Sequence, residues 1–188
     1  MSILPIFIPH AGCPHQCVFC NQKTISGQKL AAVAGAKEQL ARWRSWLRPS
    51  VVNEAAFYGG SFTGLPLELQ EELLALTDAL LAEGFIGSVR LSTRPDYIDE
   101  ERLQLLQCHG VRLVELGVQS LDDRVLAAAE RGHTAAQVAP AVALLKRFGF
   151  QVGLQLMVGM PEQSFDSVQE TVRKAIAMQP DVARIYPL

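Results

Sequence analysis

Short apolar, β-branched runs alternate along the chain with longer stretches in which apolar residues recur every three or four positions. The short runs predict six strands and the longer stretches predict the helices between them. The predicted strands cover residues 3–9, 54–60, 88–95, 112–120, 151–161 and 182–188, and the predicted helices cover 36–47, 65–84, 99–110, 122–130, 135–148 and 165–179. Several strands are almost continuously apolar, as strands buried on both faces are. The pattern therefore predicts an α/β fold with a parallel sheet and outer helices.

The predicted strands share a second feature, which is that each ends in small or polar residues. These residues are Gly12, Gly59, Gly60, Ser61, Ser92, Thr93, Gln119, Ser120, Gly159, Pro161, Tyr186 and Pro187. Turn chemistry alone explains any one Gly or Pro. However, the carboxyl ends of parallel strands meet on one side of an α/β fold, where the connecting loops form the functional site. We therefore expect these residues to lie on one rim.

The sixth predicted strand, residues 182–188, has no helix after it and leaves an apolar edge exposed. We expect residues 1–188 to form one core domain of a longer protein, whose missing C-terminal part covers this edge. The alternative is that a partner or a second copy of the chain covers it.

Composition narrows the class of protein. The 188 residues are 49% hydrophobic and 19% charged, with a formal net charge of −2, which is typical of a soluble globular domain. This balance provides no overall basic field for nucleic acid or anionic membrane, although a local patch is compatible with it. The apolar start does not resemble a secretory signal, and no run approaches the roughly 20 apolar residues of a membrane span. We expect a cytoplasmic protein without a membrane partner.

Three of the four cysteines lie within eight positions, as Cys13, Cys17 and Cys20 in a C-x3-C-x2-C arrangement. Thiols stay reduced in the cytoplasm, so clustered cysteines indicate metal or redox ligands and not disulfides. Three soft sulfur ligands suit either an iron–sulfur cluster or zinc. A four-iron cluster held by three cysteines leaves one iron without a protein ligand, and a catalytic metal site needs such an open position.

A structural zinc site needs a fourth protein ligand. Cys108 is far away in the sequence and is expected to be a small buried hydrophobic residue. His10 or His15 would complete a Cys3His zinc site, and this alternative stays open.

The motif "CPHQCVFC" (13–20) resembles the cluster-binding signature of the radical S-adenosylmethionine (SAM) enzymes, including the aromatic Phe19 before the last cysteine. The chain resembles the radical SAM domains of the elongator catalytic subunit and of the oxygen-independent coproporphyrinogen oxidases. The resemblance implies a partial (β/α)6 TIM-like barrel and a [4Fe–4S] cluster bound by Cys13, Cys17 and Cys20. It also implies that SAM chelates the open iron and that an external one-electron reductant drives cleavage of SAM to a 5′-deoxyadenosyl radical.

The same resemblance assigns SAM contacts to the strand ends. Backbone carbonyls of Gly59, Gly60 and Ser61 in "YGGSF" (58–62) would receive the amino group, although many members carry a glutamate where Ser61 stands. Arg131 would bind the carboxylate as a planar guanidinium. Polar residues would bind the ribose, and these are Gln119, Ser92 and Gln155, of which the last two stand where relatives often carry carboxylates. The backbone of Phe19 and residues 156–161 would form the adenine slot.

Several of these residues, and a few others, also have structural interpretations. Arg131 by itself is typical of a surface ion pair, and His133 is typical of a structural histidine. The basic and aromatic residues near the first helix suggest an RNA-stacking patch, and these are Arg42, Trp43, Arg44, Trp46 and Arg48. However, Leu40, Trp43, Trp46 and Leu47 share one helical face and predict core packing. Pro95 and Asp99 are typical of a turn and a helix cap.

The sequence thus predicts a radical SAM enzyme whose substrate is open. Modification of transfer RNA is a candidate by analogy with the elongator relatives. The alternatives are a non-catalytic module for RNA or protein binding, stabilised by zinc or a cluster, and a radical SAM fold that binds SAM without turnover.

Overall fold

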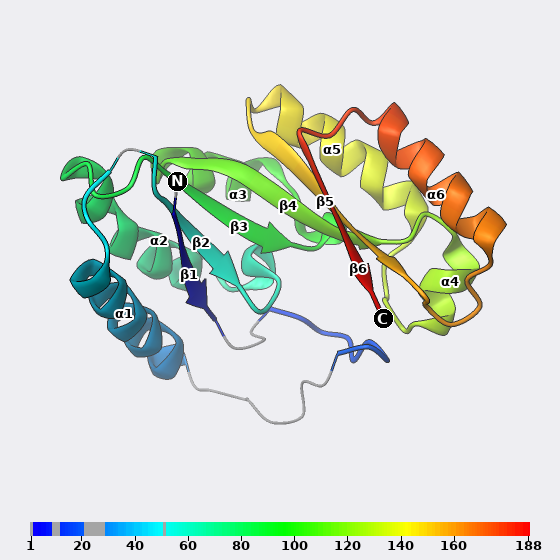
Figure 1. The fold of residues 1–188 in the computed structure, drawn as a ribbon, viewed down its shortest axis with the longest axis horizontal. Helices are drawn as coiled ribbons and strands as arrows, with labels where there is room; N and C mark the ends of the chain where they lie inside the picture. The colour runs from blue at the N-terminus through cyan, green and yellow to red at the C-terminus, as the bar shows by residue number, and fades with distance from the viewer. Residues whose placement is uncertain (1, 9–11, 21–28, 51) are drawn as a thin grey trace.

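The computed structural model describes residues 2–8, 12–20, 29–50 and 52–188, with the backbone alone for residues 29–31. Within these residues six parallel strands form one sheet in chain order. The strands are β1 (Ile3–Phe7), β2 (Glu54–Tyr58), β3 (Ser88–Thr93), β4 (Val111–Gln119), β5 (Gln151–Val158) and β6 (Val182–Pro187). The sheet curls into a half-barrel with helices on its outer side (Figure 1). The predicted partial (β/α)6 barrel is confirmed.

The helices lie between the strands, as the sequence pattern predicts. They are α1 (Lys29–Trp46), α2 (Leu67–Ala82), α3 (Glu100–Cys108), α4 (Asp123–Ala128), α5 (Val138–Arg147) and α6 (Phe165–Ala177), with short 3₁₀ turns η1 (Phe62–Gly64), η2 (Pro95–Tyr97) and η3 (Ala135–Gln137). Asp99 caps α3 by accepting a hydrogen bond from the Arg102 N–H at 2.9 Å, which confirms the predicted cap. Across the described residues, no helix combines the length and apolar character that a bilayer crossing requires.

The two faces of the sheet differ in character. Side chains on the outer face pack against the helices and form the main core, including Leu4, Ile6, Phe57, Leu91, Val114, Leu116, Val152 and Leu154. The inner face carries charged groups at alternating positions, among them Glu54, Arg90 and Glu115. The expectation that the strands bury apolar side chains on both faces is therefore wrong for β2, β3 and β4.

The surroundings of helix α1 show which of its predicted packing residues contact the core. Leu40 and Leu47 pack on the core, and the Trp43 indole N–H donates to the Pro5 carbonyl at 2.9 Å. Trp46 is 66% exposed and meets Trp43 edge-on with 5.5 Å between ring centroids. The packing interpretation is confirmed for Leu40, Trp43 and Leu47 and is wrong for Trp46.

Strand β6 lies at one end of the sheet and pairs with β5. Ile185 on this strand and Leu188 directly after it are exposed. The apolar edge that the sequence predicts is therefore present in the described part of the chain.

Candidate functional site

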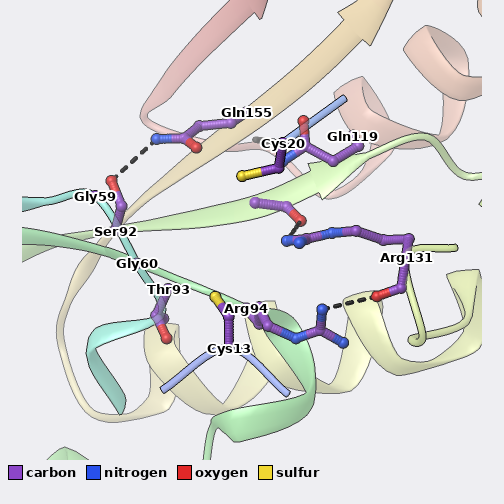
Figure 2. Close-up of a pocket in the computed structure, with 11 residues that line it drawn as sticks. Cys13, Cys20, Gly59, Gly60, Ser92, Thr93, Arg94, Gln119, Arg131 and Gln155 are labelled. Carbon is purple, nitrogen blue, oxygen red and sulfur yellow. Dashed lines mark hydrogen bonds between the residues drawn. The ribbon is translucent and has the colours of Figure 1, made fainter. Parts of the chain in front are cut away.

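The carboxyl ends of β2, β3, β4 and β5 surround a pocket of about 230 Å³ together with the cysteine loop, residues 12–20. Its lining consists of Cys13, Cys20, Gly59, Gly60, Ser92, Thr93, Arg94, Gly117, Gln119, Arg131 and Gln155 (Figure 2). Eight of these residues carry a cofactor or metal role in the sequence prediction, and they come from six separate segments of the chain. The parallel topology places them together, as expected for strand ends.

The cysteine loop is attached to the end of α4. The Val18 N–H donates to the Ala129 carbonyl at 3.2 Å, and the Cys20 N–H donates to the Cys17 carbonyl at 2.9 Å. Cys17 is buried, and its Sγ accepts a hydrogen bond from Arg131 Nη1 at 3.5 Å. Figure 2 shows Cys13 and Cys20 entering the pocket beside Arg94 and Arg131.

Two glycines allow this loop to sit close to the barrel. Gly12 has φ +85°, and a Cβ there would lie 2.3 Å from the Ser61 carbonyl oxygen. Gly132 has φ +78°, and its Cβ would lie 2.3 Å from His15 Nε2. Because glycine has no side chain at these two positions, the loop can approach the end of β2 and the segment that follows α4 this closely.

The described residues do not support a zinc site. Among them, no three His, Cys, Asp or Glu side chains converge as ligands of a single metal ion. His15 packs instead against Gly132, and His10 lies outside the described residues. A four-iron cluster makes a different demand, because each cysteine binds a different iron and the three sulfurs surround a larger group.

Cys108, the fourth cysteine, is at the end of α3 and is exposed. The prediction that it is buried is therefore wrong. Its position at the last residue of α3 separates it from the pocket lining.

Gln119 reaches the pocket because β4 ends irregularly. The register between β4 and β5 shifts between Gly117 and Gln119, and Gln119 has φ +66°. A left-handed conformation is uncommon for a residue other than glycine, and such irregularities redirect side chains next to functional sites. The shift places the Gln119 side chain on the pocket wall, and the sequence pattern alone does not reveal it.

Arg131 is a buried pocket residue. It follows the left-handed Glu130 (φ +53°), and its N–H donates to the Leu126 carbonyl at the end of α4. Its side chain is 8% exposed, and Nη2 donates to the Gly117 carbonyl at 2.8 Å. Nε is buried and has no hydrogen-bond partner in the described structure. The surface ion-pair interpretation is wrong.

Arg94 is a pocket residue that sequence reasoning missed. It is fully buried and pairs with Asp96 through Nε and Nη2 at 2.9 and 2.8 Å. Its Nη1 donates to the Arg131 carbonyl at 2.7 Å, as Figure 2 shows. The sequence could have indicated Arg94 as a pocket residue, because it directly follows a strand, as the other rim residues do.

Ser61 lies beside Arg94 and not on the pocket wall. It is fully buried; its hydroxyl lies 3.0 Å from Thr93 Oγ1 and accepts from the Arg94 N–H. The structure therefore uses the Ser61 side chain to join the ends of β2 and β3.

Phe19 belongs to a second, smaller apolar cluster. It packs with Met157, Val125, Ala129 and Met160. The structure thus brings Phe19 together with residues 156–161, the two parts of the expected adenine slot.

Ser92 and Gln155 line the pocket and are joined by a hydrogen bond of 3.0 Å, with Gln155 Nε2 as donor (Figure 2). Gln155 Nε2 also donates to Glu115 Oε2 at 2.8 Å. Sequence reasoning missed Glu115. The signal was the alternation of polar and apolar residues in "VELGV" (114–118), which indicates a strand with one polar face.

His133 is buried behind the pocket. Burial is the main cause that lowers its pKa from 6.5 to about 4, and the positive charges of Arg131 and Arg94 lower it further. The Asp96 carboxylate and the Val118 backbone oppose this shift. Neither ring nitrogen has a hydrogen-bond partner within the described residues. With a pKa of about 4, the ring is neutral at pH 7.

This low pKa predicts acid sensitivity. Between pH 6.5 and 4 the unfolded chain protonates His133 while the folded chain does not, so stability falls as the pH falls through this range. The full effect is about 3 kcal/mol. In urea unfolding of the cluster-free chain between pH 4 and 8, the His133→Gln variant should show a flatter pH dependence than wild type. The control is His109→Gln, because His109 pairs with the exposed Asp78; an unchanged slope in His133→Gln would contradict the prediction.

Comparison with known proteins agrees with this geometry. An oxygen-independent coproporphyrinogen III oxidase from Paracoccus denitrificans is 30% identical over 182 residues, covering 93% of this chain and 40% of that protein. A tRNA uridine(34) acetyltransferase from Methanocaldococcus infernus is 25% identical over 228 residues, covering 100% of this chain and 43% of that protein. The chain therefore spans less than half the length of these two relatives.

Solved structures show the same fold. Coproporphyrinogen III oxidase from Escherichia coli has a TM-score of 0.74 at 20% identity, covering 99% of this chain and 43% of that one. Elp3 from Methanocaldococcus infernus has a TM-score of 0.71 at 22% identity, covering 100% of this chain and 46% of that one. A family model described as the radical SAM superfamily matches residues 7–175. Since this match covers most of the 188 residues, the chain belongs to the radical SAM superfamily.

Proposed function

We propose that residues 1–188 form the catalytic core of a radical SAM enzyme that cleaves S-adenosylmethionine reductively. The observation that carries this proposal is that Cys13, Cys20, Gln119 and Arg131 line the same pocket. In this pocket the Cys13 and Cys20 thiols, which would bind the cluster, lie with the Arg131 guanidinium, which suits a carboxylate.

The donor set fits a [4Fe–4S] cluster and SAM. Cys13, Cys17 and Cys20 would hold the cluster, and the glycine turn at Gly59 and Gly60 would offer backbone carbonyls to the SAM ammonium. The buried Arg131 has an unpartnered Nε, which leaves a donor that suits the SAM carboxylate.

We assign the ribose contacts to the remaining pocket residues and the adenine contacts to the apolar cluster that contains Phe19. Gln119, Ser92 and Gln155 would hold the ribose hydroxyls, and the adenine would lie near Phe19 and residues 156–161. Ser61 is not part of the pocket wall, so its proposed contribution is limited to the backbone of the turn.

Held by Cys13, Cys17 and Cys20, a bound cluster would supply the one electron that reductive cleavage of SAM requires. The contribution of the chain is to bind and orient the two groups and to limit access of water. Arg94 would help to position Arg131, because its Nη1 donates a hydrogen bond to the Arg131 carbonyl. The hydrogen bond from the Val18 N–H to the Ala129 carbonyl would keep the cysteine loop at the strand ends.

Anaerobic reconstitution tests the proposal. The chain loaded with iron and sulfide, reduced with dithionite and supplied with SAM should form 5′-deoxyadenosine, measured by liquid chromatography. A chain that holds the full cluster and binds SAM but forms no 5′-deoxyadenosine would support a SAM-binding fold without turnover. A colourless chain with tightly held zinc and no SAM binding would instead support an interaction module.

For the substrate we propose transfer RNA, modified in the cytoplasm with an external one-electron reductant. Support comes from the relative named as a tRNA uridine(34) acetyltransferase. Arg42, Trp46 and Arg48 are exposed on and just after α1, which is a surface of the kind on which RNA bases stack. Tritium or deuterium transfer from tRNA into 5′-deoxyadenosine is the measurement, and its absence with several tRNA pools would reject this substrate.

A further inference from the structure

One charged side chain beside the pocket has no role in the proposed function. Glu115 is 1% exposed and lies on the inner face of β4, opposite Ser92 on β3 and Gly153 on β5. Its carboxylate forms ion pairs with Arg90 and Arg184. In these pairs it accepts hydrogen bonds and donates none.

The neighbouring strand makes room for Glu115. A Cβ on Gly153 would lie 2.8 Å from Glu115 Cγ. A side chain at this position of β5 would therefore displace Glu115, so glycine allows the carboxylate to reach across to Gln155.

Glu115 determines how the Gln155 amide is oriented. A side-chain amide can present either its NH₂ or its oxygen to a neighbour. Because Glu115 Oε2 only accepts, the amide turns its NH₂ toward it at 2.8 Å, and the same NH₂ donates to Ser92 Oγ at 3.0 Å. Both amide hydrogens are thus used, and the Gln155 oxygen is left as an acceptor. Figure 2 shows the nitrogen directed at Ser92 and the oxygen turned toward the side where Cys20 lies.

We infer that Glu115 is a positioning residue that fixes Gln155 as a hydrogen-bond acceptor for a sugar hydroxyl of the bound nucleoside. The inference rests on the proposed SAM function and names the group that sets selectivity for the ribose. It acts through Gln155, because Glu115 itself is not on the pocket wall.

The consequence is selectivity for a ligand that donates a hydrogen bond at this point. A ribose hydroxyl does so, whereas a deoxyribose leaves the Gln155 oxygen without a donor. A lost neutral hydrogen bond of this kind weakens binding by about tenfold.

The test measures binding to the cluster-loaded chain without reductant, so that no turnover occurs. Dissociation constants are determined by calorimetry for SAM, 2′-deoxy-SAM and 3′-deoxy-SAM. Wild type should prefer SAM over at least one deoxy analogue by about tenfold. Glu115→Gln should bring this ratio to within about twofold, because a neutral amide at position 115 lets Gln155 turn around. Gln155→Met should have the same effect, and the double variant should add nothing.

The matched control is Glu54→Gln. Glu54 pairs with the other side of Arg90 at 3.2 Å, so this variant removes a charge from the same network while Gln155 stays anchored. Its ratio should equal that of wild type, whereas a merely structural role of the charges would change both glutamate variants alike.

Several outcomes would overturn the inference. A folded Glu115→Gln variant that keeps the tenfold ratio would do so, and so would a wild type that binds SAM and both deoxy analogues equally. If circular dichroism shows that Glu115→Gln does not fold, Gln155→Met decides the matter, because an unchanged ratio there rejects the inference. A wild type that binds no SAM at all rejects the proposed function instead.

Discussion

Replacing Cys17 with alanine should abolish cluster binding. Two thiolates would remain, and they do not hold a four-iron cluster that needs three protein ligands. The iron and sulfide contents of the reconstituted chain should drop to background, and its brown absorption should disappear. Cys13→Ala and Cys20→Ala should behave alike, because each sulfur would bind a different iron of the proposed cluster.

Cys108→Ala is the matched control for this experiment. Cys108 is exposed at the end of α3, so the variant should retain full iron content and absorption. Circular dichroism checks that each variant is folded. If the folded Cys17→Ala chain kept the iron content of wild type, the assignment of the three cysteines as ligands would be wrong.

Replacing Arg131 with glutamine should weaken SAM binding by about 10- to 100-fold. The variant would lose the proposed charge-assisted contact with the SAM carboxylate, and such contacts in a buried site are among the strongest hydrogen bonds. Arg131→Lys should bind with intermediate affinity, because lysine keeps the charge but not the planar fork. The measurement is calorimetric titration of the cluster-loaded chain without reductant.

Decarboxylated SAM separates a direct contact from a general disturbance of the pocket. Wild type should prefer SAM to this analogue, and Arg131→Gln should bind both alike. Arg124→Gln is the control, because the Arg124 side chain is 81% exposed and pairs only locally with Asp122. A folded Arg131→Gln variant with wild-type affinity for SAM would remove Arg131 from the SAM site.

The polar inner face of the half-barrel was readable in the sequence but was not predicted. Glu54, Arg90 and Glu115 stand at positions of their strands where every second side chain faces inward. The apolar residues between them suggested strands buried on both faces, whereas the correct period is two. The charges are tolerated in the interior because each guanidinium meets a carboxylate.

Trp46 is a case in which the sequence pattern was followed and the prediction was wrong. Its spacing from Trp43 fits a packing stripe, yet Trp46 is exposed while Trp43 is held by the Pro5 carbonyl. Helical spacing states which residues share a face, but the width of the face that the sheet covers depends on how the helix lies against it.

The sequence by itself determined the order of strands and helices and the three cysteines of the loop, because hydrophobic periodicity and ligand spacing are local properties of the chain. The half-barrel was implied by the resemblance to the radical SAM enzymes. Only the tertiary structure decided that Arg131 is buried against Cys17, that Arg94 holds its carbonyl, and that Glu115 orients Gln155. These contacts join residues that are 37 to 114 positions apart in the sequence. Their geometry follows from strand register, a bulge and glycine-sized gaps, which arise when the sheet closes and not from any local pattern.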